Sequence, residues 1–414
     1  MSETEPTGHN PANGQLPEGW VFSPLKPHIQ SRSGDSKIIK GKQQSKPADG
    51  LIQGFSASGP DVWVESAQYQ TAGVVVSAVG ARCGKTFLAQ SPWTAIANTH
   101  ALIPDEDIDV RFLWHLSNRE EWWIKSGTAQ PFVKVKDTLE RSMPIPPLAE
   151  QKKIVEILEE QLSRLDAALE SVRVVREKAA QFRRSLLHAA FTGTLTGHNP
   201  ADGQLPEGWQ QIALGEIVSM KSGFAYKSRD WQETGVPVIK IANVRAGKVT
   251  IEGCSHIDES IAAETVEFAV NESDILMTLT GEIGAIGVYR ESFESRLNQR
   301  VARIDLDATE RILLSYLIGF LESPEFRSEM WRLSKGMAQP NISPKQVVAI
   351  GMGLPPLTEQ EQIVEILEEQ LSRLDAALAV ADAIEKRSAA LRRSLLHAAF
   401  TGRLTEQWRE LSHV

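Results

Sequence analysis

The stretch IVEILEEQLSRLDAAL occurs twice in the 414-residue chain, at Ile154–Leu169 and again at Ile363–Leu378. In both copies apolar residues recur at alternating three- and four-residue intervals, which is typical of a helix that packs along one narrow face. PPLAEQ precedes the first copy, PPLTEQ precedes the second, and SLLHAAFTG follows both. The chain therefore carries two nearly identical long helices, which we predict at 148–196 and 357–405.

The repeat also includes the segment before each variable block. GHNPANGQLPEGW at Gly8–Trp20 returns as GHNPADGQLPEGW at Gly197–Trp209, an offset of 189 residues, whereas the long helices are offset by 209. The second variable block is therefore 20 residues longer than the first. The predicted segments are a leader at 1–19, a first block at 20–147, a first helix at 148–196, a linker at 197–208, a second block at 209–356, a second helix at 357–405 and a tail at 406–414.

Each long helix presents one apolar seam. The seam shifts by three residues between Val172 and Val175 in the first helix, and between Ala381 and Ile384 in the second. A helix of about 41 residues spans roughly 60 Å, and the nearest partner for so long a seam is the other copy. The residues predicted to continue the seam after the shift are Val175, Ala179, Phe182, Leu186, Ile384, Ser388, Leu391 and Leu395.

The order of segments fixes the direction of the predicted pair. The first helix leaves the first block, and the second helix leaves the second block, so pairing requires the two helices to be antiparallel. The tail TGRLTEQW is similar to TGTLTGHN, which precedes the second leader. The chain is therefore predicted to be nearly circular in organisation, with approximate two-fold symmetry and neighbouring termini.

The two blocks have strand-like rather than helical patterns. GVVVSAVG from Gly73, DILMTLTG from Asp274 and VPVIKIANV from Val236 are short apolar or β-branched runs. Short helices are predicted at 110–126 and 311–333. The predicted fold class is α+β, with two α/β domains separated by a pair of long antiparallel coiled-coil helices.

Composition is that of a soluble globular protein, with 42% hydrophobic and 23% charged residues. Cys83 and Cys254 stand in unrelated segments, which predicts neither a disulfide framework nor a zinc site. The leader has no secretory pattern, and the longest apolar runs are too short to span a bilayer. We therefore expect a cytoplasmic protein with no membrane association.

The net charge of −9 disfavours strong binding of nucleic acid by this chain alone. One segment of the first block is nonetheless basic, because Asp35 stands there against six cations. Two interpretations of this segment remain open: a loop that contacts the phosphates of nucleic acid, and an ordinary solvated loop rich in lysine. The six cations are Lys26, Arg32, Lys37, Lys40, Lys42 and Lys46.

Motifs for catalysis are not found in the sequence. GARCGKT resembles the end of a phosphate-binding loop, but three residues separate Gly80 from Gly84 where that loop needs four. The second block has LTGEIGAIGVY at the same place, and asparagines follow both turns, at Asn98 and Asn298. The nine histidines show no metal-ligand spacing. We predict a tight turn here, with no catalytic residues and no metal in this chain.

The exposed positions of the two long helices are as similar as the buried ones. A recent duplication would explain this, but packing would preserve only the seam, and the two blocks have diverged. Two identical outer surfaces predict two copies of one partner. The predicted docking residues are Glu159, Glu160, Gln161, Arg164, Glu368, Glu369, Gln370 and Arg373.

The chain resembles the specificity subunit of type I restriction-modification enzymes. The resemblance covers nearly the whole length and is carried by PPLAEQKKIVEILEEQLSRLD, PPLTEQEQIVEILEEQLSRLD and the SLLHAAFTG segments. GMAQPNIS, GVPVIKIANV and DILMTLTGEIGAIG are similar to the target-recognition domains of that family. The first block is shorter and has no obvious counterpart of GVPVIKIANV.

The resemblance implies a non-catalytic subunit that recognises double-stranded DNA. Each block would recognise one half of a split, asymmetric site, and the helices would set the spacing and dock two modification subunits. Methylation with S-adenosylmethionine, and cleavage with ATP and Mg by restriction subunits, would belong to the partners, so no cofactor is expected in this chain. Two other functions remain open: a stand-alone regulator with two DNA-binding modules, and a coiled-coil scaffold that binds only proteins.

Long polar donors on predicted loops are the candidates for DNA contact. Gln130 and Gln339 are predicted to be either structural or DNA-contacting. The predicted DNA-binding residues are Lys37, Lys40, Lys42, Gln43, Gln44, Arg82 and Lys85 in the first block, and Lys221, Ser222, Tyr226, Lys227, Lys240, Asn243 and Arg245 in the second.

Overall fold

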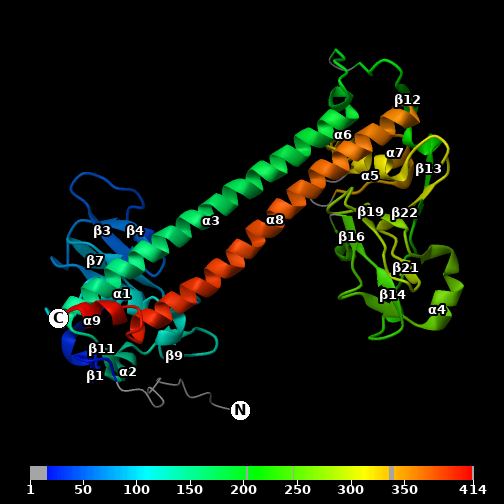
Figure 1. Cartoon of the computed structure of the whole chain (residues 1–414). Helices are drawn as coiled ribbons and strands as arrows, with labels where there is room; N and C mark the ends of the chain where they lie inside the picture. The colour runs from blue at the N-terminus through cyan, green and yellow to red at the C-terminus, as the bar shows by residue number, and fades with distance from the viewer. Residues whose placement is uncertain (1–15, 202–203, 246, 335–339, 413–414) are drawn as a thin grey trace. The chain divides into compact units, whose positions relative to one another are not determined.

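The computed structural model of the chain describes residues 16–201, 204–245, 247–334 and 340–412. It divides into two compact units (Figure 1). Unit 1 comprises Met1–Ser171 and Ala383–Val414, and unit 2 comprises Val172–Asp382. Each unit thus holds one variable block and a part of both long helices. Most of the predicted leader, and Gln339, lie outside the described residues.

The two long helices are α3 (Leu148–Phe191) and α8 (Leu357–Phe400), each 44 residues long. Each begins directly after a Pro-Pro pair, because proline is tolerated only at the start of a helix. Each ends shortly before a glycine with positive φ, Gly193 at 81° and Gly402 at 77°. Both helices begin at the predicted residues, 148 and 357, and end at 191 and 400, five residues before the predicted ends.

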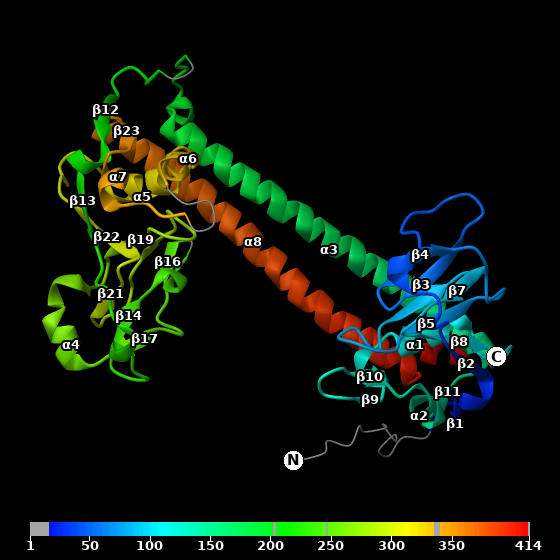
Figure 2. The same cartoon turned by 180° about the vertical axis from the view of Figure 1, so that it is seen from behind.

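The long helices are antiparallel within each unit (Figures 1 and 2). In unit 1 the start of α3, with Ile154 and Leu158, shares a hydrophobic core with Ala399 near the end of α8. In unit 2 the end of α3, with Phe191, shares a core with Ile363 near the start of α8. The prediction of an antiparallel helix pair is confirmed.

The predicted three-residue shift of the seam is wrong. In α3, Val172, Ala179 and Leu186 are all buried, which continues the original seven-residue spacing, while Val175 is 42% and Phe182 is 45% exposed. The equivalent residues of α8 behave alike. Ala381 and Ser388 are buried, whereas Ile384 is 40% and Leu391 is 46% exposed.

The seam continues without a shift because arginines occupy some of its positions. The two arginine side chains are 41% and 42% exposed, and each guanidinium reaches an acid of the other helix. In unit 2, Arg176 pairs with Asp382 of α8 at 2.7 Å. In unit 1, Arg392 pairs with Asp166 of α3. A count of apolar residues misses such positions, and it assigned the seam to the apolar residues beside them.

Unit 1 contains two main sheets that pack with a short helix, α1 (Val110–Ser117). Their strand orders are β2-β8-β5-β6 and β4-β3-β7, and two small strand pairs, β1-β11 and β10-β9, complete the unit. The bounds are β1 Val21–Pro24, β2 Ile29–Ser33, β3 Ile52–Ser56, β4 Gly59–Val64, β5 Gly73–Ser77, β6 Thr86–Ala89, β7 Trp93–Ala95, β8 Thr99–Pro104, β9 Lys125–Ser126, β10 Phe132–Val133, α2 Val135–Glu140, β11 Ser142–Ile145 and α9 Glu406–Ser412.

Unit 2 contains sheets of order β13-β22-β19-β20-β16-β15 and β17-β14-β21-β18, and a strand pair β12-β23. The bounds of its strands are β12 Gln210–Ala213, β13 Val218–Ser222, β14 Val236–Ile239, β15 Val244–Arg245, β16 Gly247–Val249, β17 Ser255–Ile257, β18 Ala269–Val270, β19 Ile275–Thr278, β20 Ile286–Val288, β21 Ser295–Leu297, β22 Val301–Leu306 and β23 Gly351–Leu354. Its short helices are α4 Glu259–Glu264, α5 Leu314–Glu322, α6 Pro324–Leu333 and α7 Pro344–Val348.

The two units repeat one topology. The order β2-β8-β5-β6 in unit 1 corresponds to β13-β22-β19-β20 in unit 2. In the second sheets, β3 pairs in parallel with β7, and β14 pairs in parallel with β21. Strand β3, with the sequence IQGFS, is therefore the counterpart of VPVI in β14, although the two share no sequence pattern. The predicted α+β class, with two mixed domains and a long helix pair, is confirmed.

A buried carboxylate joins both ends of the described chain in unit 1. Glu150, in the first turn of α3, accepts a hydrogen bond from Trp20 Nε1 at 2.9 Å and another from Thr405 Oγ1 at 2.6 Å. The guanidinium of Arg409 pairs with the same carboxylate. We call Trp20, Glu150, Thr405 and Arg409 the Glu150 cluster. It supports the predicted circular organisation, because Trp20 and Arg409 meet on one side chain.

Unit 2 has the equivalent arrangement around Glu359 of α8. Its carboxylate accepts hydrogen bonds from Thr196 Oγ1 at 2.6 Å, His198 Nε2 at 2.9 Å and Trp209 Nε1 at 3.1 Å. The C-terminal Thr405 and Arg409 therefore take the place in unit 1 that Thr196 and His198 take in unit 2. We call Thr196, His198, Trp209 and Glu359 the Glu359 cluster.

A glutamine next to each of these carboxylates ties the long helix to its block. Gln151 is fully buried and donates to the carbonyls of Asp107 and Pro146, both at 2.9 Å. Gln360 donates in the same way to Arg311 at 3.0 Å and Pro355 at 2.9 Å. The repeated dipeptide Glu-Gln thus anchors each block to a helix, which explains why it is present in both copies.

No helix in the described part of the chain is long and apolar enough to cross a membrane. Both cysteines are free thiols, as predicted.

Candidate nucleic-acid interface

The basic segment of unit 1 presents some free cations and some engaged ones. Lys37 and Lys42 are exposed, and neither ammonium has a partner among the described residues. Lys40 forms an ion pair with Asp61. Gln44 is exposed, but its carbonyl accepts from the backbone N–H of Trp63 at 2.9 Å, which fixes this part of the loop. The exposed segment Lys37–Gln44 is therefore held in place by a few contacts and keeps several donors free.

The turn GARCGKT joins β5 to β6, as predicted. Gly80 and Gly84 have φ of 98° and 91°, a conformation that favours glycine, and Cys83 between them is buried. Arg82 is exposed on the turn, while Lys85 Nζ lies 5.6 Å from the centre of the Phe87 ring. The glycines serve a turn between two strands, so the resemblance to a phosphate-binding loop is superficial.

Most of the cations chosen in unit 2 contact groups of their own unit. Lys221 pairs with Glu267 at 3.0 Å, and Arg245 lies 3.8 Å from Glu282. Lys240 donates to Ser255 Oγ at 2.7 Å and lies over the ring of Trp231, and burial lowers the pKa of this lysine. A DNA phosphate would have to compete with these contacts.

Two residues chosen in unit 2 are buried. Asn243 is 4% exposed, and its Oδ1 accepts from the backbone N–H of Lys240 at 3.0 Å, so it closes a local turn. Tyr226 is 8% exposed, its hydroxyl bonds to Thr265 at 3.2 Å, and burial raises its pKa. Neither side chain offers a free polar group at the surface, because each is buried and makes a hydrogen bond within its own unit. Ser222 and Lys227 stay accessible.

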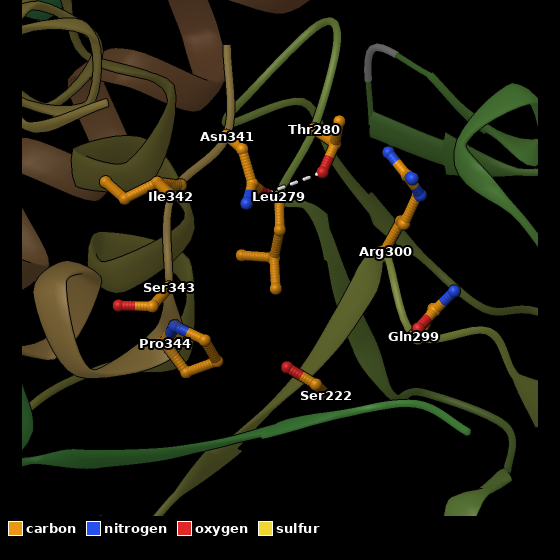
Figure 3. A pocket seen from close by; sticks show the side chains of 9 residues that line it. All are labelled: Ser222, Leu279, Thr280, Gln299, Arg300, Asn341, Ile342, Ser343 and Pro344. Atoms are coloured by element: carbon orange, nitrogen blue, oxygen red, sulfur yellow. Dashed lines mark hydrogen bonds between the residues drawn. The ribbon is translucent and has the colours of Figure 1, made fainter. Parts of the chain in front are cut away.

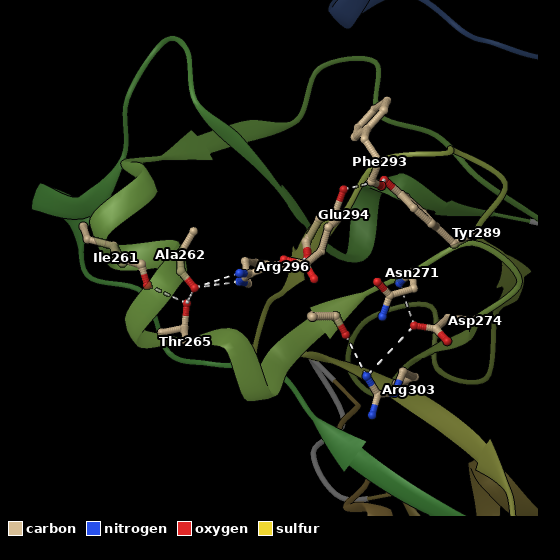
Figure 4. A network of polar contacts seen from close by, with 12 residues as sticks. Ile261, Ala262, Thr265, Asn271, Asp274, Tyr289, Phe293, Glu294, Arg296 and Arg303 are labelled. Atoms are coloured by element: carbon tan, nitrogen blue, oxygen red, sulfur yellow. Dashed lines mark hydrogen bonds and ion pairs between the residues drawn. The ribbon is translucent and has the colours of Figure 1, made fainter.

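Arg296 and Arg303 of unit 2 make polar contacts within the unit (Figure 4). Sequence patterns do not distinguish these two arginines from surface cations. Arg296 is buried and donates twice to the carbonyl of Ala262 at the end of α4, at 2.8 and 3.0 Å. Arg303 donates to Asp305 at 2.8 Å and to the carbonyl of Ala269 at 2.7 Å. The Arg303 contact with Ala269 joins the two sheets of the unit, and the Arg296 contact holds α4 on strand β21, so both guanidinium groups are used within the unit.

The predicted docking residues form the same ion pair in both helices. Arg164 pairs with Glu160, and Arg373 pairs with Glu369, each at 2.6 Å. Gln161 and Gln370 are half-buried beside them.

The copies differ at one predicted docking position. Glu159 of α3 contacts His115 at 3.1 Å and pairs with Arg111, both on α1, whereas Glu368 of α8 is exposed. Burial lowers the pKa of His115 below its ordinary value. Glu159 therefore serves to hold α1 on the helix, and only its counterpart presents a free carboxylate.

The sequence did not predict the exposed apolar pairs of the long helices. Val175 and Phe182 in unit 2, and Ile384 and Leu391 in unit 1, stand two turns apart on one face of their helix. The members of each pair are 40% to 46% exposed. Each pair occupies the same place in its own copy of the repeat, so the chain presents one apolar feature twice.

The fold also brings together a histidine and two acids that are distant in sequence. His28 Nδ1 lies 3.0 Å from Asp105 Oδ2 and 3.7 Å from Asp107 Oδ2 at the surface of unit 1. Their ligand atoms lie within 4.8 Å of one another, a spacing that suits a metal ion and equally an exposed ion-pair cluster. Sequence spacing could not predict this group, because 77 residues separate His28 from Asp105.

Residues 61–171 and 206–379 match the family model of the type I restriction modification DNA specificity domain. The chain belongs to this family. The first range covers the later part of the first block and the first part of α3, and the second covers the second block and the first part of α8. They cover more than half of the 414 residues. The repeated topology of the two units agrees with two matches to one family model.

Relatives with known names are specificity subunits of the same family. The specificity subunit of the type I restriction enzyme EcoBI from Escherichia coli is 29% identical over 334 residues, covering 74% of this chain and 68% of the relative. That of MjaVIII from Methanocaldococcus jannaschii is 26% identical and covers 78% and 77%. That of EcoKI from Escherichia coli is 25% identical and covers 96% and 91%.

Solved structures show the same fold at low sequence identity. A chain from a study of complex assembly and conformational transition of the type I R-M system aligns with a TM-score of 0.66 and 18% identity, covering 94% of this chain and all of that one. The HsdS subunit from Thermoanaerobacter tengcongensis aligns with a TM-score of 0.52 and 19% identity, covering 95% and 99%. The fold is thus that of a specificity-domain protein.

Proposed function

We propose that the chain is the DNA-specificity subunit of a type I restriction-modification enzyme. The observation that carries the proposal is the pair of units with one topology and different surface residues. Two such domains suit the recognition of two different half-sites, since direct recognition depends on the side chains that a constant backbone presents. Unit 1 then recognises one half of a split site and unit 2 recognises the other.

The chemistry belongs to partners in this proposal. Two modification subunits methylate DNA with S-adenosylmethionine, and restriction subunits use ATP and Mg to translocate and cleave it. This chain supplies sequence recognition and no catalytic group. The net charge of −9 supports such a division, because the partners would then provide much of the contact with phosphate. The assembly acts on double-stranded DNA in the cytoplasm.

The repeated helix surfaces support two equivalent docking sites for the modification subunit. Each copy of the helix offers the Arg–Glu pair, Arg164 with Glu160 or Arg373 with Glu369, on an otherwise identical stretch. Each copy also offers one exposed apolar pair. A surface that occurs twice binds a partner twice, because both contacts have the same chemistry.

Exchange of residues 209–356 for the equivalent block of a relative tests the proposal. The modified-base sequence of DNA from a host that expresses the exchanged chain with its methyltransferase should retain one half-site and acquire a new second half-site. The reciprocal exchange of residues 20–147 should change only the other half. A methylated sequence that both exchanges leave unaltered would contradict the assignment.

The same assay separates the two other functions. A stand-alone regulator binds its DNA sequence selectively without a methyltransferase, whereas we expect tight and selective binding only from the assembled complex. A protein-only scaffold leaves the methylation of DNA unchanged when either block is replaced. Gel-shift experiments with and without the methyltransferase subunit distinguish these outcomes.

Lengthening both helices tests their role in spacing. Insertion of seven residues after Leu169 and seven after Leu378 preserves the seven-residue spacing of each seam and adds about 10 Å to each helix. We expect the gap between the half-sites to increase by about three base pairs at 3.4 Å per base pair, with both halves unchanged. The gap is measured by the same modified-base sequencing, and an unchanged gap would show that helix length does not set it.

A further inference from the structure

A polar pocket of about 480 Å³ lies at one end of the six-stranded sheet of unit 2 (Figure 3). Ser222 at the end of β13 forms its floor, and the segment Asn341–Pro344 forms one side. Gln299 and Arg300, in the turn between β21 and β22, project from the opposite side. The pocket therefore gathers residues from turns that are distant in sequence.

The long side chains at this pocket are not used within the protein. Gln299 and Arg300 are exposed, and neither side chain makes a hydrogen bond or ion pair with any residue that the structure describes. Some other cations of unit 2 are engaged, since Lys221 pairs with Glu267 and Arg303 pairs with Asp305. An arginine without an internal partner at a polar pocket is available to a ligand.

The opposite side of the pocket holds a fixed amide. Thr280 Oγ1 donates to Asn341 Oδ1 at 2.7 Å, which occupies the amide oxygen and sets the orientation of the side chain. The amide nitrogen of Asn341 has no partner in the described part of the chain, and the residue is exposed. The pocket thus presents an oriented amide on one side and a guanidinium on the other.

Unit 1 repeats the backbone of this pocket. Each of three backbone hydrogen bonds around it has an equivalent in unit 1 with nearly the same length, so the positions of the two units can be matched one to one. The bond from Gly281 N–H to Pro340 O, at 3.0 Å, matches the bond from Gly80 N–H to Pro131 O, at 2.8 Å. The bond from Leu279 N–H to Arg300 O, at 2.9 Å, matches the bond from Ala78 N–H to Asn98 O, also at 2.9 Å. The bond from Ile342 N–H to Leu279 O, at 3.0 Å, matches the bond from Val133 N–H to Ala78 O, at 2.9 Å.

The side chains at the matched positions differ in chemistry. The backbone hydrogen bonds match Asn98 with Arg300, not with Asn298, which sequence comparison had placed beside it. Phe132, 41% exposed, stands where unit 2 has Asn341, and Val79 stands where it has Thr280. The backbone is kept while the side chains on it change: Asn98 replaces Arg300, and the apolar Phe132 replaces Asn341, as two domains with different half-sites require.

We propose that Arg300, Gln299 and Asn341 contact base edges of the half-site recognised by unit 2. This inference rests on the proposed function and assigns it to particular side chains. Arginine can donate two hydrogen bonds to guanine O6 and N7, and an amide side chain can bond adenine N6 and N7. In unit 1 the exposed Phe132 at the matched position suits the methyl group of thymine instead.

Two substitutions test the assignment in the chain assembled with its methyltransferase subunit. Arg300→Ala and Asn341→Ala should each relax the methylated sequence at one base pair of one half-site, with a loss of discrimination of roughly ten-fold. Thr280→Val, which installs the residue of unit 1, should give a smaller loss at the position affected by Asn341→Ala, because it releases the amide. Modified-base sequencing and binding to duplexes with single base changes measure the effect.

Arg290→Ala is the matched control, because Arg290 is an exposed arginine of the same unit outside this pocket. The half-site recognised by unit 1 controls for folding and assembly within the same experiment, and it should not change in any variant. Variants that methylate the unaltered sequence would overturn the assignment. So would a uniform loss of affinity for all duplexes, since it would indicate contact with phosphate rather than with bases.

The two levels of the argument fail separately. If the unsubstituted assembly methylates no split sequence, the proposed function fails, and the assignment of these residues fails with it. If that assembly methylates a split sequence and the Arg300→Ala and Asn341→Ala variants do so identically, only the assignment fails.

Discussion

Replacement of Glu150 by alanine is expected to lower the free energy of unfolding of unit 1 by about 3 to 5 kcal/mol. The carboxylate is buried, and it binds Trp20, Thr405 and Arg409 at once. Its removal leaves a guanidinium that is only 14% exposed without its acid. Removing one partner of a buried ion pair lowers the free energy of unfolding by more than the intact pair contributes to it, because the remaining charge stays desolvated.

The equivalent substitution in unit 2 should cost less. Glu359 binds Thr196, His198 and Trp209, none of which carries the permanent charge of an arginine. The loss from Glu359→Ala is therefore that of unsatisfied hydrogen-bond donors, about 1 to 3 kcal/mol. The difference between the two substitutions isolates the contribution of the charge on Arg409.

Urea unfolding followed by tryptophan fluorescence measures both losses, and hydrogen–deuterium exchange assigns each one to its unit. Assignment is needed because a protein of two units does not unfold in one step. Glu156→Ala is the control: Glu156 is exposed on the same helix, and Lys153 is its ion-pair partner among the residues that the structure describes. If Glu150→Ala changed stability no more than this control, the Glu150 cluster would have no role in closing the chain.

The second large effect is expected at the exposed apolar pairs. Phe182→Asp should weaken the binding of one copy of the modification subunit, Leu391→Asp should weaken the binding of the other, and the double substitution should weaken both. Both side chains are almost half exposed in the isolated chain and would be desolvated in an interface. A buried aspartate in place of either would weaken binding by about 2 kcal/mol or more, which is roughly thirty-fold.

Native mass spectrometry of the assembled complex gives the number of bound subunits directly. The matched controls are Ala180→Asp and Ala389→Asp, which add the same charge at exposed, equivalent positions of the two helices. They should leave two subunits bound. A double Phe182→Asp and Leu391→Asp variant that still binds two subunits would place docking elsewhere on the chain.

Sequence patterns predicted the parts of the fold that follow from backbone periodicity. The starts of α3 and α8, their antiparallel pairing and the strands near Gly73, Val236 and Asp274 follow from repeats, prolines and apolar runs. The seam shift was wrong because Arg176 and Arg392 stand at seam positions, where each pairs with an acid of the other helix, and the pattern counts them as polar. β3 and β14 correspond because each pairs in parallel with a later strand of its sheet. The sequences of the two strands share no pattern that would reveal this.

Predicting contact residues was harder because exposure of a cation depends on its neighbours. Lys221 and Lys240 looked like free donors in the sequence, but Glu267, 46 positions away, engages the first and the ring of Trp231 engages the second. Arg300 and Asn341 lie 41 positions apart, and only the ends of three strands bring them to one pocket. The sequence repeat did indicate that the turn after β19 corresponds to the turn after β5. Which residue of one turn matches which residue of the other follows from the backbone hydrogen bonds.

The division of unit 1 between two stretches of chain affects the order of events during synthesis. The ribosome must translate as far as Arg409 before Glu150 can acquire all its partners, whereas every residue of unit 2 has been made by Asp382. Unit 2 can therefore finish folding first, although its block is encoded second. A nascent chain stalled between Asp382 and Thr405 would carry a mature second half and an open first half.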